Sequence, residues 1–83
     1  MARMSVDTVV GQIKEKISRD LLLMYQEALG GTKDYDKVQR LYGGISIMNE
    51  ILADLGAEYE GEDCDTAYAK VAPIIQEWVI KDE

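Results

Sequence analysis

Apolar side chains recur along the first part of the chain at the spacing of one face of an α-helix. Steps of three or four residues separate the members of this stripe, which are Val6, Val10, Ile13, Ile17, Leu21, Met24 and Ala28. Ser5 can cap the helix, and Asp7 lies in the first turn, where the helix dipole favours an acid. The pair Gly30 and Gly31 can end it, because glycine adopts the left-handed C′ conformation at no steric cost. The pattern predicts a helix over residues 5–29.

A second apolar stripe follows after a short connection. Its members alternate steps of three and four residues, as the a and d positions of a heptad do: Val38, Leu41, Ile45, Met48, Leu52 and Leu55. Thr32 or Asp34 can cap this helix and Gly56 can stop it, which predicts a helix over residues 33–55. A connection this short places the two helices antiparallel. We therefore expect an all-α fold, with an αα-hairpin in a single domain that spans residues 1–83.

The last third of the chain contains an acidic segment and a third periodic segment. The stretch "AEYEGEDCD", from Ala57 to Asp65, holds five acids in nine residues and predicts an acidic, solvated linker over residues 57–64. Helical spacing resumes through Tyr68, Val71, Ile75 and Trp78. These residues predict a helix over residues 65–80 that packs on the hairpin, kinked or restarted at Pro73. A short strand over residues 74–80 is the alternative.

The composition is that of a globular protein, and its charge is uneven. Hydrophobic residues make up 47% of the 83 residues and charged residues 30%. Of the net charge of −7, residues 57–83 contribute −6, from eight acidic and two basic side chains. Phosphate backbones are bound by clustered Lys and Arg, and the sequence has no such cluster. We expect no direct contact with nucleic acid.

Nothing in the sequence indicates a membrane segment or a signal peptide. The longest apolar run, "LLLMY", is far shorter than the ~20 residues needed to cross a bilayer, and the first residues lack a signal-peptide core. A single cysteine, Cys64, excludes an internal disulfide. We expect a soluble protein of a reducing cytoplasm that is not secreted and does not bind membranes.

The residue types also argue against catalysis. The chain has no histidine, so Ser-His-Asp, Cys-His and His-containing zinc sites cannot be built. Cys64 lies between Asp63 and Asp65, whose charges oppose a reactive thiolate. An EF-hand register that starts at Glu58 would need glycine where Asp63 stands. We expect no enzyme activity, no catalytic residue, no metal and no cofactor.

The helices carry more apolar surface than a hairpin needs. Leu22, Tyr25 and Leu29 form a second stripe on the first helix, and Ile47 and Ile51 flank the seam of the second. Two interpretations stay open. Either the C-terminal segment folds back and covers these stripes through Ile74, Ile75, Trp78 and Val79, or some of this surface docks on a larger assembly.

A pair of glycines inside the second predicted helix adds to this surplus. Each costs about 0.8–1 kcal/mol relative to alanine in a helix interior. Gly44 is expected near the hairpin seam, beside Met48 and Ile51, where it would let another helix approach. Gly43 points away from the seam, beside Ile47. The predicted partner-binding residues are therefore Leu22, Tyr25, Leu29, Gly43, Ile47, Ile51 and Trp78.

The segment "KDYDKVQRLYGGI", preceded by "ALGG", resembles small helical-hairpin proteins encoded in the virion-assembly gene clusters of tailed bacteriophages. The resemblance covers about residues 5–55, and its most specific residues are Lys33, Asp34, Tyr35, Arg40, Leu41, Gly43 and Ile45. The family pattern has one glycine where this chain has Gly43 and Gly44. The resemblance implies a structural protein that binds capsid, portal or neck components. Such a protein would be located in the host cytoplasm during assembly and then in the virion.

A second hypothesis uses the acidic residues. A small phage or mobile-element inhibitor could imitate a row of phosphates and occupy the basic channel of a host nucleic-acid-binding protein. Its acidic surface would consist of Glu58, Glu60, Glu62, Asp63 and Asp65, joined by Glu77. Under either hypothesis the partner is a protein, and an oligomeric virion component or a second copy of the chain would fit the first.

Overall fold

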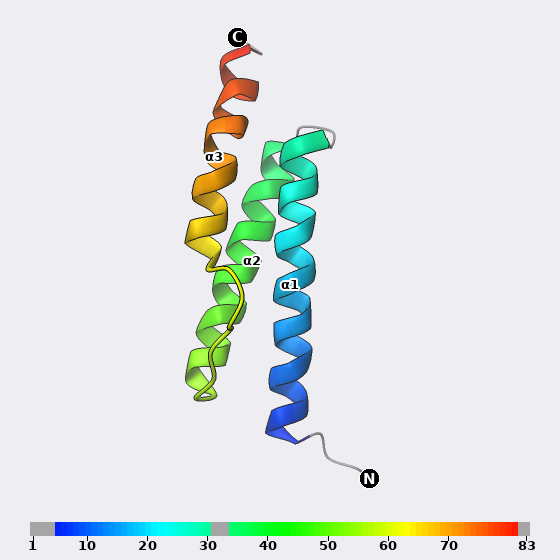
Figure 1. Cartoon of the computed structure of the whole chain (residues 1–83), viewed down its shortest axis with the longest axis vertical. Helices are drawn as coiled ribbons and strands as arrows, with labels where there is room; N and C mark the ends of the chain where they lie inside the picture. The colour runs from blue at the N-terminus through cyan, green and yellow to red at the C-terminus, as the bar shows by residue number, and fades with distance from the viewer. Residues whose placement is uncertain (1–4, 31–33, 82–83) are drawn as a thin grey trace.

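A computed structural model describes residues 5–30 and 34–81, with side chains up to Trp78. Three helices account for most of them: α1 (Val6–Gly30), α2 (Tyr35–Asp54) and α3 (Cys64–Lys81) (Figure 1). α1 and α2 form the antiparallel hairpin, and α3 packs against both. The expected all-α hairpin with a C-terminal helix is confirmed. None of the described helices is long and apolar enough to cross a membrane.

The starts of α1 and α2 are capped by the residues that the sequence indicates. The Ser5 hydroxyl accepts a hydrogen bond from the backbone N–H of Thr8 at 3.1 Å. The Asp34 carboxylate accepts one from the backbone N–H of Lys37 at 3.1 Å, which makes Asp34 the cap of α2. Thr32 and Gly31 lie outside the described residues.

Glycine ends α2 in the predicted way, but the end of α1 differs from the prediction. Gly56, just after α2, has φ +76°, a left-handed conformation that favours glycine. Gly30 is instead the last residue of α1 itself, and its φ is not positive. The end of α2 is therefore set as predicted, whereas Gly30 does not end α1 in a left-handed conformation.

α3 is one helix that runs through Pro73, so the predicted restart there is wrong, as is the alternative strand. Proline removes one backbone donor and crowds the carbonyl four residues earlier, here that of Ala69. Both Pro73 and Ala69 are exposed, so water can satisfy the freed carbonyl. The start of α3 is fixed by Asp63, whose carboxylate accepts hydrogen bonds from the backbone N–H groups of Asp65 and Thr66.

The core lies between the three helices and follows the predicted stripes. Its buried members are Ile17, Leu21, Met24, Ala28, Val38, Ile45, Leu52, Cys64, Ala67, Val71, Ile75 and Trp78. α3 begins about halfway along the hairpin and ends beyond the ends of α1 and α2 that adjoin the hairpin turn (Figure 1). This offset makes the molecule elongated, with extents of 55 × 23 × 15 Å. The first half of α1 and the second half of α2 are consequently not covered by α3.

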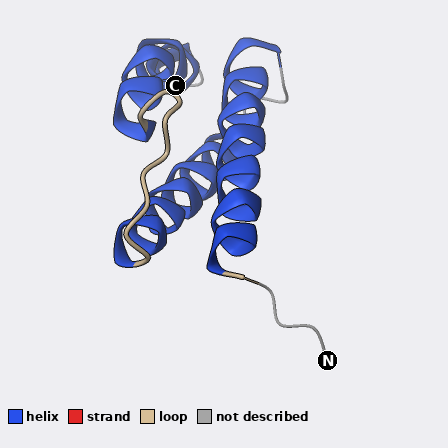
Figure 2. Cartoon of the chain, turned by 60° about the horizontal axis from the view of Figure 1, so that its bottom comes forward, coloured by secondary structure: helices blue, strands red, loops and turns tan. Residues whose placement is uncertain are grey.

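The linker covers part of that surface instead. It runs as an extended segment from the end of α2 to the start of α3 (Figure 2). Ala57 and Tyr59 are half-buried against the core. The Tyr59 ring folds back over Gly61, where a Cβ atom would lie 2.6 Å from the far end of the ring, so a larger residue at this position would make the ring shift. The prediction of a solvated linker is therefore wrong for its tyrosine and its alanine.

Candidate functional site

Four of the exposed large apolar side chains form two separate patches. The α1 patch consists of Leu22 and Leu29, which are 57% and 72% exposed. The α2 patch consists of Gly43, Ile47 and Ile51; the two isoleucines are 58% and 42% exposed. α3 covers neither patch, so the interpretation that the C-terminal segment folds over these stripes is wrong for all four large side chains.

The antiparallel hairpin keeps the two patches apart. The α1 patch lies in the second half of α1, next to the first turns of α2, whereas the α2 patch lies in the middle and second half of α2. With a rise of about 1.5 Å per residue, their centres are offset by about 15 Å along the hairpin. The α1 patch and the α2 patch are therefore on different helices and at different positions along the hairpin.

Two predicted members of the partner-binding set lie elsewhere. Trp78 is only 8% exposed and belongs to the core. Tyr25 is half-buried, and its hydroxyl donates a hydrogen bond to Glu62 of the linker. Tyr25 thus ties the linker to α1. Trp78 packs α3 on the hairpin, because α3 continues as a helix past Pro73 and brings this side chain against the core.

Three exposed apolar side chains were not predicted as surface. Val6, Tyr35 and Leu55 are exposed, and each lies at or next to a helix end. Val6 and Leu55 belong to the predicted core stripes, but they lie at the outer ends of α1 and α2. The available signal was position: residues in a terminal turn have fewer helical neighbours than those in the middle of the same stripe.

Both glycines of the α2 pair face open space. A Cβ atom added at Gly43 or at Gly44 would meet nothing within 4 Å. The prediction that Gly44 permits close approach of another helix at the hairpin seam is therefore wrong, because no described atom of α1 comes that near. Gly43 is exposed beside Ile47, as expected. Neither glycine is explained by packing within the described part of the chain.

The acidic linker is tied to the helices by most of its acids. Glu60 forms an ion pair with Lys14 of α1, with 2.6 Å between Oε1 and Nζ. Glu62 accepts hydrogen bonds from Lys70 of α3 and from Tyr25. The partners lower the pKa of both glutamates below the usual range, through the Lys14 hydrogen bond at Glu60 and mainly through Lys70 at Glu62.

Two further acids contribute to the α2–α3 junction. Asp65 accepts a hydrogen bond from the Tyr42 hydroxyl at 2.6 Å, which raises the pKa of Tyr42 to about 12. The Tyr42 ring stacks on that of Tyr68, with 4.4 Å between centroids, and Asp63 caps α3. Of the predicted acidic surface, Glu58 is exposed. The other four acids have intramolecular partners rather than forming a free row of charges.

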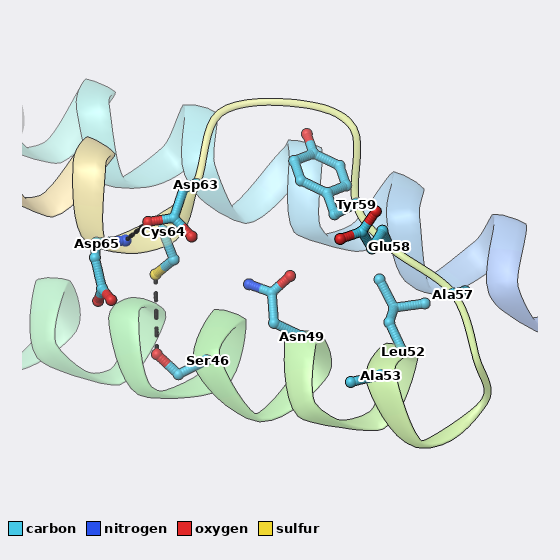
Figure 3. A pocket seen from close by; sticks show the side chains of 10 residues that line it. All are labelled: Ser46, Asn49, Leu52, Ala53, Ala57, Glu58, Tyr59, Asp63, Cys64 and Asp65. Atoms are coloured by element: carbon cyan, nitrogen blue, oxygen red, sulfur yellow. Dashed lines mark hydrogen bonds between the residues drawn. The ribbon is translucent and has the colours of Figure 1, made fainter.

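A hollow of about 340 Å³ opens between α2, the linker and the start of α3 (Figure 3). Cys64 and Ser46 face one another across it, with 3.9 Å between Sγ and Oγ, and Asn49 extends into it. The Cys64 thiol is buried and also donates to the carbonyl of Tyr42 at 3.8 Å. Burial raises the pKa of the thiol, which disfavours the nucleophilic thiolate. The hollow thus lies where α2, the linker and the start of α3 meet, and it is lined by a buried thiol.

Sequence reasoning missed a polar contact that joins α1 to α2. Glu27 is buried; its Oε1 accepts from the backbone N–H of Asp34 at 3.1 Å, and its Oε2 lies 3.5 Å from the Lys37 ammonium. Asp20, seven residues before Glu27 on α1, is also buried and lines a second hollow with Arg40 and Leu41. The seven-residue spacing of the two acids beside the apolar stripe was the available signal.

Comparison of the chain with protein-family models, with curated proteins and with solved structures gives no match. The resemblance to phage assembly proteins thus stays a prediction. The surface offers two uncovered apolar patches on rigid helices, and the described residues contain no group of three His, Cys, Asp or Glu side chains that could hold a metal ion.

Proposed function

We propose that this chain is a non-enzymatic assembly protein that docks onto other proteins through the exposed apolar patches of α1 and α2. From the resemblance, the setting is a tailed phage particle, and the partners are capsid, portal or neck components. The observation that carries the proposal is the exposure of Leu22, Leu29 and Ile47 after all three helices have packed. Exposed leucines and isoleucines on a rigid surface gain most when a partner covers them.

The packing of the linker and α3 supports the same proposal. Both elements are already fixed on the hairpin, by the Lys14–Glu60 pair, the Ser18–Tyr59 hydrogen bond and the buried Trp78. Covering the α1 or α2 patch from within the described chain would require breaking these contacts. An external partner could cover either patch without breaking these contacts.

The alternative function as an acidic inhibitor receives no support from the geometry. A phosphate mimic needs carboxylates that are free to meet basic groups of its target. Here the acids of Glu60 and Glu62 are paired with Lys14 and Lys70, so a target would have to replace existing ion pairs. The carboxylates of Glu60 and Glu62 thus connect the linker to α1 and α3 through ion pairs.

The test is a pair of charge substitutions in the two patches, with a buried control. Leu22→Asp and Ile47→Asp should each leave the far-ultraviolet circular dichroism and the unfolding free energy nearly unchanged, because surface substitutions usually change it by less than about 0.5 kcal/mol. Each should reduce binding to purified virion structural proteins encoded beside this chain. Ile17→Asp, at a buried position, should unfold the chain. Unfolding caused by Leu22→Asp or Ile47→Asp would instead place these residues in an intramolecular core.

A further inference from the structure

The α2 patch has a sequence that is complementary to itself when two copies of the helix run in opposite directions. Ile47 lies near the middle of the patch, and Gly43 and Ile51 are each four residues from it. Arg40 and Asp54 are each seven residues from it, which is two helical turns and hence the same face. We infer that the α2 patch binds the α2 patch of a second copy of this chain, in an antiparallel dimer with two-fold symmetry. This inference rests on the proposed function in treating the patch as a docking surface. It assigns the α2 patch to a second copy, so that the α1 patch meets the virion component and Ile47→Asp acts on that binding through loss of the dimer.

The two-fold axis at Ile47 determines which side chains meet. An isologous contact pairs each residue with the one equally far from the axis on the other copy. Ile47 then meets Ile47, and Ile51 lies over the second copy's Gly43. Because nothing lies within 4 Å of a Cβ placed at Gly43, that position leaves room for the isoleucine. The glycine thereby gains the packing role that the described part of the monomer does not give it.

The same register places opposite charges together. Arg40 of each copy meets Asp54 of the other, at both ends of the contact. Within the described structure the Arg40 side chain donates only to the backbone carbonyl of Asp36, at 3.4 Å, and neither Arg40 nor Asp54 belongs to an ion pair. Both are therefore available for the second copy. The other register that puts isoleucine over glycine, with its axis between Gly44 and Ser46, would oppose Asp36 and Asp54, two like charges.

The charge of the whole chain also favours this face for self-association. Two copies with a net charge of −7 repel one another, yet most of that charge lies in residues 57–83. α2 itself carries three acidic and two basic side chains, a net charge of −1. α2 therefore carries only a small part of the charge that opposes contact between two copies. The exposed area of two isoleucines per copy is small compared with the ~800 Å² per partner of a stable complex, so we expect a dimer that forms in the micromolar to millimolar range.

The experiment is sedimentation equilibrium of the purified full chain over that concentration range, with circular dichroism to verify folding. The wild type should dimerise reversibly. Arg40→Glu and Asp54→Arg should each weaken the dimer about tenfold or more, because each loses both ion pairs and gains two like-charge contacts. The double variant Arg40→Glu/Asp54→Arg should recover most of the lost affinity. Leu29→Asp, in the equally exposed α1 patch, is the matched control and should leave the dimer unchanged.

A wild type that stays monomeric up to millimolar concentration overturns the inference, and so does a dimer that the double variant fails to restore. A dimer weakened by Leu29→Asp would show that the α1 patch, not the α2 patch, is the contact. These results are separate from the proposed function: a dimer that captures no virion component contradicts only the proposed function. A monomer that binds such a component, with loss of binding in Leu22→Asp, contradicts only the dimer.

Discussion

Replacing Gly43 by alanine separates the cost of this residue in the monomer from its use in an interface. Gly43 lies in the middle of α2, is exposed, and a Cβ atom there meets nothing within 4 Å. Alanine therefore fits without strain. It is expected to raise the free energy of unfolding by about 0.8–1 kcal/mol, the difference in helix propensity. For a chain of this size, that corresponds to a rise in Tm of about 4–8 °C.

The same change should act in the opposite direction on self-association. Across the proposed two-fold axis, the added methyl group at Gly43 would contact the second copy's Ile51, and it would do so twice. Overpacking of a tight contact typically costs about 1–3 kcal/mol, so the dissociation constant of the dimer should rise about tenfold or more. Thermal unfolding at low micromolar concentration, where the monomer predominates, measures the first effect. Sedimentation equilibrium measures the second.

Gly11 provides the matched control for Gly43. It is also an exposed glycine inside a helix, with nothing within 4 Å of an added Cβ, but it lies in α1, outside both patches. Gly11→Ala should stabilise the monomer by a similar amount and leave self-association unchanged. A Gly43→Ala variant that gains stability and still dimerises like the wild type would refute the interface role of Gly43. A variant that loses stability would refute the open surroundings of that position.

Three further predictions concern the fold. Met24→Ala, at a fully buried position, should lower the free energy of unfolding by about 2–5 kcal/mol, measured by urea denaturation. Asp34→Ala removes the cap of α2 and should cost about 1 kcal/mol in the same assay. The hydrogen bond to Asp65 raises the pKa of Tyr42 to about 12, so its stabilisation is complete below the ordinary tyrosine pKa of about 10 and is lost as the pH rises towards 12. The hydrogen bond to Glu62 also raises the pKa of Tyr25, so ultraviolet titration at alkaline pH should show both tyrosines ionising late. Asp65→Asn should shift only the ionisation of Tyr42 to lower pH, and no shift would contradict this contact.

The helices were predictable because each has a long, regular apolar stripe and a local start signal. Met24 and Ile45 are buried as their spacing indicates, and Asp34 caps α2. These features depend on neighbours within a few residues along the chain. They therefore could be read without knowledge of how the helices pack.

The path of the linker and the fate of the surplus apolar residues depend on packing between distant segments. Tyr59 reaches Ser18, and Tyr25 reaches Glu62, across 41 and 37 residues of sequence. No periodicity encodes such pairs, and an acidic composition alone suggests a solvated loop. Likewise, the burial of Trp78 depends on where α3 lies along the hairpin, and the exposure of Leu29 depends on which face of α1 the other two helices cover.

The most direct test of the proposed function is the native mass of the chain after mixing with purified capsid, portal and neck proteins encoded beside it. The wild type should form a defined complex with one of them. Leu22→Asp should have an unchanged circular dichroism spectrum and a binding affinity reduced at least tenfold, because it places a charge in the α1 patch. A wild type that binds none of these proteins, or a Leu22→Asp variant that binds as well as the wild type, would contradict docking through the α1 patch.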